Sequence, residues 1–291
     1  MLQIASNTVV SFCHLLMLGL GLGLIYRTTK FLDISFAGTV SCACYTLYLF
    51  VERLGQSWIV GFALALASAT CLAFVAHGIF LRRQRNMADA PLVLLLASLG
   101  IYVVLQNIAA LAFGNDPRVI RRGSVEVGHR FSGVYLTDVQ LLTIAIGLLL
   151  FVGVLVLINY TRLGQRIRAV SSDPDLAGVV GVRVNEVKFW AVGIGSVLGA
   201  AAGILAALDT SMTPTMGFRL LLNGLIVMII GGVGSVGGLL GGALLLAAAQ
   251  NFTAYYVGDK WTDAVSFLIL IGFLIWKPLG FSGQRLRKVE V

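Results

Sequence analysis

Residues that could carry out catalysis are few and scattered in this sequence. The histidines, His14, His77 and His129, lie far apart, and two of them lie in apolar stretches that suit packed rather than ligating side chains. The four cysteines also lie in apolar stretches, and Cys42 and Cys44 lack the paired C-x-x-C spacing of a zinc site. No G-x-x-x-x-G-K-[ST] phosphate-binding loop occurs. We therefore expect no catalytic residue, no metal site and no cofactor in this chain.

Polar side chains inside apolar segments indicate a different chemistry, the passage of a solute. A polar side chain in hydrocarbon is costly, so it tends to face the interior of a helical bundle or a water-filled cavity. On that ground we expect a substrate pathway lined by Asp33, Ser35, Gln106, Asn107, Asp209, Thr213 and Asn223. Simpler roles stay open, because Asp33 could cap a helix start and Gln106 could join Asn107 in an interhelical hydrogen bond. Asp209 and Thr213 could likewise cap a helix end.

The segment 161–188 is the longest basic loop and carries Arg166 and Arg168. Either Ser172 or Asp173 can cap a helix with Pro174 at its first position and Asp175 in its first turn. Gly181 is suited to ending that helix. The apolar side chains that this helix would present are Leu176, Ala177, Val179 and Val180. A short capped helix of this kind suits the cleft of another protein, although a surface loop that only returns the chain fits the composition equally well.

Glycines cluster between two apolar segments near the C-terminus, at Gly231, Gly232, Gly234, Gly237 and Gly238. Glycines spaced by about four residues let helices approach closely. They also free the backbone where a helix breaks, and a broken helix at membrane depth can line a transport path. Close packing against a second subunit explains the pattern as well, and both explanations stay open.

The surroundings of these residues predict a membrane protein. The 291 residues are 58% apolar and only 12% charged, with a mean hydropathy of +0.93, whereas a soluble domain has about 25% charged residues. The apolar residues come in blocks of about 20, the length of a membrane-spanning helix. The net charge of +8 arises from residues between the blocks rather than along one face. It therefore indicates membrane orientation and not nucleic-acid binding.

We expect an all-α, polytopic bundle formed by one domain, residues 1–291, with about eight or nine transmembrane segments. The apolar segments run roughly over 8–26, 31–51, 58–80, 91–113, 139–160, 189–208, 220–233, 236–257 and 262–276. The seventh is short and could be broken or re-entrant. An arrangement with the N-terminus outside and the C-terminus inside places most of the 21 Lys and Arg residues inside. The first segment lacks signal-peptide features, so we expect it to remain as a membrane helix.

The external loop, 114–138, differs from the rest. Its part 123–137 alternates apolar and polar residues with glycine between them. This pattern predicts a short β-hairpin outside the membrane, with an irregular loop as the alternative.

Four stretches resemble a known family of transporters. The first is 166–185, Arg-Ile-Arg-Ala-Val-Ser-Ser-Asp-Pro-Asp-Leu-Ala-Gly-Val-Val-Gly-Val-Arg-Val-Asn. The others are 91–107 with 113–118, 213–218 with 231–242, and 261–265 with 277–283. Together and in this order they resemble the permeases of ABC importers of the branched-chain amino acid (and urea) type. The turn 28–38 departs from that pattern, because Asp33 stands where such permeases usually carry Asn and the following His is absent.

The resemblance implies a multi-pass permease in a bacterial inner membrane, not an enzyme. It implies two ABC ATPase subunits that bind ATP and Mg, a second and different permease subunit, and a solute-binding protein outside. It also implies that 161–188 is a cytoplasmic coupling loop, whose short helix docks on the ATPase subunits. Branched-chain amino acids are the expected solute, with other amino acids, urea, short amides or a sugar as alternatives. A secondary transporter driven by an ion is the other class, and it would need Asp33 or Asp209 to carry the coupling.

Overall fold

The computed structural model describes residues 1–84, 90–120, 129–131, 134–232, 235–277 and 280–281. The α-helices are α1 (Leu2–Thr29), α2 (Ser35–Tyr48), α3 (Trp58–Gln84), α4 (Ala90–Phe113), α5 (Asp138–Tyr160), α6 (Arg162–Ser172), α7 (Pro174–Val179), α8 (Val184–Asp209), α9 (Met216–Gly231), α10 (Val236–Tyr256) and α11 (Thr262–Trp276). A π-helical turn, Leu49–Arg53, follows α2, and a 3-10 turn, Asp259–Trp261, precedes α11.

Each of the nine predicted apolar segments contains one of these helices, which confirms the all-α membrane architecture. In the part of the chain that the structure describes, six helices are long and apolar enough to cross a membrane: α1, α3, α4, α5, α8 and α10. By contrast α2, α9 and α11 have only 14, 16 and 15 residues. Length and composition therefore establish six crossings and leave the predicted total of eight or nine as an expectation.

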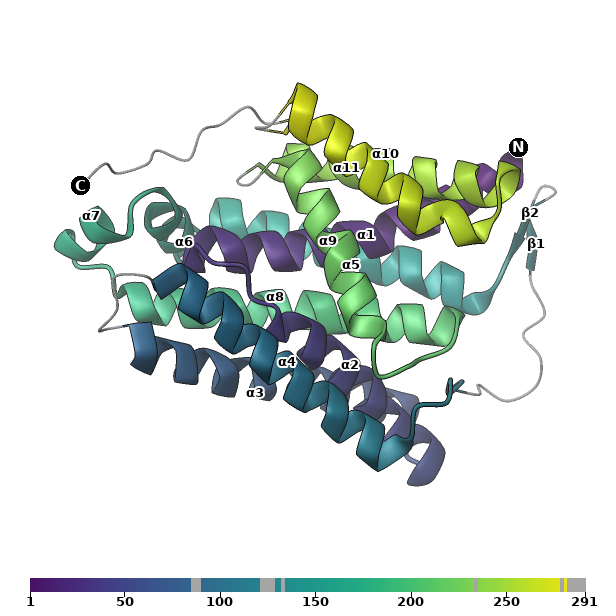
Figure 1. The fold of residues 1–291 in the computed structure, drawn as a ribbon, viewed down its shortest axis with the longest axis horizontal. Coiled ribbons are helices and arrows are strands. Elements are labelled where there is room, and N and C mark those ends of the chain that lie inside the picture. Colours follow the sequence, from purple (N-terminus) through teal and green to yellow (C-terminus); the bar gives the residue numbers. More distant parts are fainter. Residues whose placement is uncertain (85–89, 121–128, 132–133, 233–234, 278–279, 282–291) are drawn as a thin grey trace.

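The centre of the bundle is formed by α1 and α8, which cross each other and are surrounded by the other helices (Figure 1). Their most apolar stretches are 72% and 78% buried, compared with 22% for both α4 and α5. The crossing is close because glycines meet there: a Cβ at Gly21 would lie 2.7 Å from the carbonyl oxygen of Gly195, and the reverse distance is also 2.7 Å. Small residues therefore decide which helices occupy the centre.

The two ends of the bundle differ. At the end near the N-terminus, β1 (His129–Phe131) pairs antiparallel with β2 (Val134–Leu136). This confirms strand pairing within the predicted hairpin, whose residues 123–128 and 132–133 lie outside the described residues. Gln3 fixes the hairpin to α1 through two 3.0 Å hydrogen bonds with the backbone of Tyr135. Helices α6 and α7 lie at the opposite end of the molecule (Figure 1).

Exposed aromatic side chains gather near both ends. Tyr255, Tyr256 and Trp261 are 59–67% exposed at the hairpin end, and Tyr160 and Trp276 are 83% and 91% exposed at the α6–α7 end. Tyr and Trp are enriched where the bilayer meets water, because their rings are apolar and their tips polar. The apolar band between these two groups is therefore the part that lies in the membrane.

Candidate functional site

The predicted short helix in 161–188 is present as α7, and the structure shows how it is held. Asp173 caps it, since its side chain accepts hydrogen bonds from the backbone N–H groups of Asp175 and Leu176, both at 3.0 Å. Pro174 occupies the first helical position, where its fixed φ angle suits the helix and its missing N–H costs nothing. Of the two predicted capping residues, the structure therefore selects Asp173 and places Ser172 at the end of α6.

The C-terminal end of α7 is also fixed. The N–H of Gly181 donates to the carbonyl of Gly178, and the N–H of Val182 donates to that of Ala177, both at 3.0 Å. This pair of bonds is a Schellman motif, which needs a left-handed residue and here uses Gly181 at φ 88°. A six-residue helix is too short to be stable alone, so these caps define its conformation.

The apolar side chains of α7 face two directions. Leu176, Val179 and Val180 are 64%, 86% and 83% exposed, whereas Ala177 is only 5% exposed. The prediction that all four present one apolar face is therefore wrong for Ala177, which packs inward because the helix needs one side to hold it against the bundle. The other three form a protruding aliphatic patch.

Helix α6, which the sequence reading treated as part of the loop, supports α7. Thr161 caps it by accepting a 3.0 Å hydrogen bond from the N–H of Gly164, and Ile167 and Val170 are fully buried against the bundle. Arg166 on the opposite side is exposed, while Arg168 is half-buried and donates to Asn159 at 3.4 Å. The alternation of buried aliphatic and outward basic residues was the signal that could have predicted this helix.

A groove lies beside α7, between α6 and α8. Its lining includes Arg166, Val180, Arg183, Glu186 and Trp190, and the space within it, including its open mouth, is about 1100 Å³. Arg183 donates to Glu186 at 2.6 Å, and this hydrogen bond raises the pKa of Arg183. The groove and the aliphatic patch together form a surface that combines apolar and charged groups.

The predicted pathway residues do not form one cluster around a cavity. Asp33 is buried and accepts hydrogen bonds from the backbone N–H of Ser35 at 2.9 Å and from the Ser35 hydroxyl. Asp33 and Ser35 are thereby held at the turn that leads into α2, although the N-cap position of that helix is Ile34 and no side chain caps it. Gln106 is half-buried, and Asn107 is exposed and bonded only along its own helix, to the carbonyl of Val103.

Asp209 and Thr213 lie at the hairpin end of the bundle. Asp209 is the exposed last residue of α8, and the Thr213 hydroxyl lies 3.3 Å from that of Thr215. The loop between them is fixed by a backbone bridge from Met212 to Arg118 in the 114–138 loop. These two residues therefore belong to a structured connection at a helix end.

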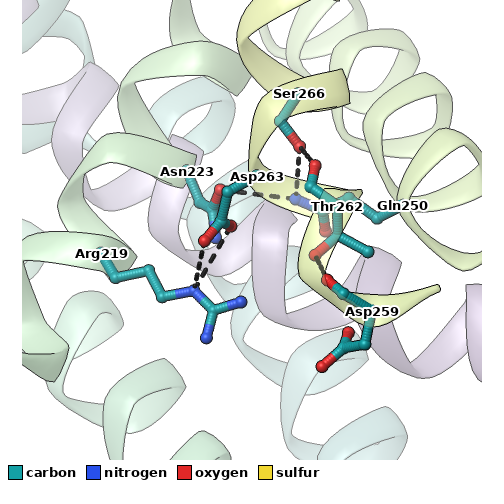
Figure 2. Close-up of polar contacts among 7 residues, drawn as sticks. All are labelled: Arg219, Asn223, Gln250, Asp259, Thr262, Asp263 and Ser266. Atoms are coloured by element: carbon teal, nitrogen blue, oxygen red, sulfur yellow. Dashed lines mark hydrogen bonds and ion pairs between the residues drawn. The ribbon is translucent and has the colours of Figure 1, made fainter. Parts of the chain in front are cut away.

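Asn223 is different, because it belongs to a group of polar side chains from three helices that are joined through Gln250 (Figure 2). Gln250 of α10 donates to Asn223 of α9 at 3.4 Å and to Ser266 of α11 at 3.0 Å. One turn earlier on α9, Arg219 pairs with Asp263 of α11 at 3.2 Å, with both side chains about half exposed. We call these five residues the α9–α11 polar cluster. The sequence reading missed four of them, although Gln250 and Ser266 are also polar residues inside predicted apolar segments.

The described glycines of this cluster lie at the end of α9 and at the start of α10. Gly231 ends α9, Gly232 has a φ angle of 85°, and α10 begins at Val236 with the Ser235 side chain as its cap. A Cβ at Gly238 would lie 1.9 Å from the carbonyl oxygen of Gly231, so packing within the chain explains these two glycines. Gly237 has no atom within 4 Å of its Cβ position, and Gly234 lies outside the described residues.

Comparison with known proteins agrees with this architecture. The chain is 24% identical over 293 residues to the high-affinity branched-chain amino acid transport system permease protein BraD of Pseudomonas aeruginosa, covering 97% of this chain and 95% of that one. It is 24% identical over 282 residues to LivH of Escherichia coli K12, a permease protein of the same description, covering 92% and 91%. A shorter match, 25% over 137 residues, covers 44% of this chain and 38% of the autoinducer 2 import system permease LsrC of Yersinia enterocolitica.

The fold also matches a solved structure, that of PsaBC from Streptococcus pneumoniae in complex with a Fab. The TM-score is 0.53 at 11% identity, and the match covers 93% of this chain and 91% of the other. Residues 4–274 match the family described as "Branched-chain amino acid transport system / permease component". Since that match takes in every helix from α1 to most of α11, this chain belongs to the branched-chain amino acid transport permease family.

Proposed function

We propose that this chain is a permease subunit of an ABC importer that moves branched-chain amino acids across the inner membrane. The family and the relatives named for branched-chain amino acid transport support this solute. Urea, short amides and sugars are the remaining alternatives for the solute. The observation that carries the ABC mechanism is α7, a helix capped at both ends that exposes Leu176, Val179 and Val180 to water.

An exposed aliphatic patch on a rigid support is typical of a surface that another protein covers. ATP hydrolysis would take place on two partner ATPase subunits, each of which receives an α7 helix from one of two permeases. ATP binding would move the ATPases, and α6 and α7 would pass that movement to the bundle, since Ile167 and Val170 fix α6 to it. This arrangement places α6 and α7 in the cytoplasm, the N-terminus and the hairpin outside, and the binding protein at the hairpin end.

The charge distribution supports this orientation. The segments at the α6–α7 end carry ten described basic residues, namely Arg27, Lys30, Arg82, Arg83, Arg162, Arg166, Arg168, Arg183, Lys188 and Lys277. The segments toward the other end carry five, namely Arg53, Arg118, Arg130, Arg219 and Lys260. An excess of Lys and Arg is typical of the cytoplasmic side. Six further basic residues, whose side of the membrane the sequence predicts, lie outside the described residues: Arg85, Arg121, Arg122, Arg285, Arg287 and Lys288.

The coupling role is tested by the double variant Asp173→Ala, Leu176→Asp. It removes the cap and places a charge in the aliphatic patch, so ATP-driven leucine uptake by the reconstituted importer is expected to stop while the permease still accumulates in membranes. The matched control is Asp173→Asn, which keeps a capping oxygen and should retain uptake. Co-purification of ATPase subunits is expected to be lost only in the double variant. Normal uptake by that variant would refute the coupling role.

We also propose that the α9–α11 polar cluster lines the solute pathway. In this cluster Ser266 is buried and Asn223 and Gln250 are partly buried. Polar groups shared by three helices supply hydrogen-bonding sites for a solute, and polar side chains within apolar segments tend to face a bundle interior or a water-filled cavity. Gln250→Leu is expected to lower leucine uptake at least tenfold while ATPase subunits still co-purify. The control is Asn251→Leu, the next residue on α10, which instead donates a 3.0 Å hydrogen bond to Ser11 of α1. Equal uptake by both variants would contradict the proposal.

A further inference from the structure

A narrow crevice lies at the α6–α7 end of the bundle, between α1, α5 and α10. Its walls are mostly aliphatic and include Leu20 and Leu24 of α1, Val154 and Ile158 of α5, and Leu239 of α10. The crevice itself has a volume of about 30 Å³, and the space is about 390 Å³ when its open mouth is included, so an occupant would lie mainly in the mouth. Arg27, in the last turn of α1, is the charged residue in the lining. An apolar slot with a cation at one end fits a molecule with an apolar chain and an anionic end.

Arg27 has no acidic partner among the residues that the structure describes. Within the described part of the chain, no acidic residue lies within ion-pair distance of Arg27 or of Arg168, the nearby cation on α6 that acts electrostatically on it. Lys30 follows one turn later, and its ammonium donates to the backbone carbonyl of Ser171. Burial and the charge of Arg27 lower the pKa of Lys30, against the opposing effect of Asp173. Three positive charges therefore lie together with one carboxylate near them.

The occupant of the crevice would come from the bilayer. On the neighbouring turns of α5, Leu148, Leu149, Val152 and Val156 are 48–72% exposed, which is the composition of a face in contact with lipid. Tyr160, at the end of the same helix, is 83% exposed at the level of the bilayer surface. The crevice thus begins at headgroup level, beside the cations, and continues into the hydrocarbon.

We propose that this crevice binds an anionic phospholipid, with one acyl chain between α1, α5 and α10 and the phosphate against Arg27 and Arg168. Guanidinium groups bind phosphate through paired, charge-assisted hydrogen bonds. The positive end of the α10 dipole adds to the attraction, because Ser235 and Val236 also line the crevice. The bound lipid would relieve the repulsion between Arg27 and Arg168 and so hold α6 against α1.

The test uses the purified full-length chain in mild detergent, with lipid retention followed by native mass spectrometry and stability by thermal unfolding. Dioleoyl phosphatidylglycerol is expected to remain bound and to raise the unfolding midpoint, while dioleoyl phosphatidylcholine, with the same chains and no net charge, does neither. Arg168→Gln should weaken retention of phosphatidylglycerol at least tenfold. Since Arg168 is half exposed, this variant is expected to fold, and Arg27→Gln is the second variant.

The matched control is Arg183→Gln, which removes a cation from the same end of the molecule but away from the crevice, and should retain phosphatidylglycerol as the unchanged protein does. Inorganic phosphate at millimolar concentration is expected to give no protection, because it lacks a chain. Protection by phosphate alone would overturn the role of the crevice. Equal retention of both lipids, or unchanged retention in Arg168→Gln, would overturn the whole proposal, and neither outcome depends on the solute or on transport.

Discussion

Two groups of strongly apolar helices occupy opposite positions in this bundle, and the peripheral group is at least as apolar as the central one. Helices α1 and α8 lie at the centre, with more than 70% of their most apolar stretches buried, whereas α4 and α5 lie at the periphery and are 22% buried. Each of these helices is apolar on all sides. The difference lies in how closely a neighbouring helix approaches. On α8, a Cβ at Gly195 would clash with α1, and a Cβ at Gly199 would clash with α2. A Cβ at Gly100 of α4 or at Gly153 of α5 would meet no atom within 4 Å.

The comparison teaches that glycine position, more than hydrophobicity, sorts helices in a membrane. Lipid tails are as apolar as leucine, so moving a leucine from lipid to protein gains little, and close packing supplies the association energy instead. Central glycines permit that packing, while Gly100 and Gly153 at the periphery have no such role. Gly147 of α5 is the point at which that peripheral helix approaches α1, since a Cβ there would lie 2.9 Å from the Cβ of Cys13. Pairs of matched substitutions in the two groups test this account.

The largest effect is expected for Gly195→Val. Its Cβ would lie 2.7 Å from the Gly21 carbonyl oxygen and 2.6 Å from Ile25, and backbone cannot move aside as a flexible side chain can. The cost should exceed about 3 kcal/mol, the upper part of the usual range for overpacking, so little folded protein should be extracted from membranes. Gly153→Val is the control and should behave like the unchanged protein in size-exclusion chromatography. Equal recovery of both would contradict the comparison.

A smaller loss is expected for Leu198→Ala on α8, where the side chain is 1% exposed. The substitution leaves a cavity, and the expected loss is about 2 kcal/mol, the lower end of the range for buried leucine, because the transfer part of that range is small in lipid. Leu149→Ala on α5, where the side chain is 72% exposed, should cost well under about 1 kcal/mol since lipid fills the space. Thermal unfolding in detergent measures both, and a lower midpoint for Leu149→Ala would reverse the assignment.

Asp33→Ala tests the turn that joins central α1 to α2. The variant removes the acceptor for the N–H and hydroxyl of Ser35, and a buried donor left without its partner costs about 1 kcal/mol or somewhat more. Asp33→Asn keeps an acceptor, so its unfolding midpoint and its leucine uptake should remain close to those of the unchanged protein. Unchanged stability of Asp33→Asn combined with lost uptake would instead show that the charge acts in transport.

The smallest effect is expected at His77, the one histidine on peripheral α3. It is 2% exposed, and in the described part of the chain neither ring nitrogen has a hydrogen-bond partner. Replacing an unsatisfied buried polar group with an apolar one is close to neutral or stabilising, so His77→Leu should leave the unfolding midpoint unchanged or raise it by the equivalent of up to about 1 kcal/mol. A decrease in that midpoint would show that the histidine has a structural role.

Features encoded within a short stretch of sequence could be predicted well. The nine apolar segments agree with helices to within about six residues at each end. The first residue and the terminating glycine of α7 were predicted, and its cap was narrowed to Ser172 or Asp173, because caps act between residues two or three apart. Helix α6 was missed although its pattern is local, since the basic residues around it suggested a loop. The orientation of Ala177 depends on a neighbouring helix, and the prediction that its side chain faces outward was therefore wrong.

The sequence by itself determined that this protein crosses a membrane with many helices, where those helices begin and end, and which family it belongs to. It also determined the rigid α7 helix with its aliphatic side chains. Only the tertiary structure decided that α1 and α8 are central, that Gln250 joins Asn223 to Ser266, and that Arg27 lines a crevice between α1, α5 and α10. The physical reason is that hydropathy and caps are properties of neighbouring residues, whereas close packing and polar contacts join helices far apart in the chain.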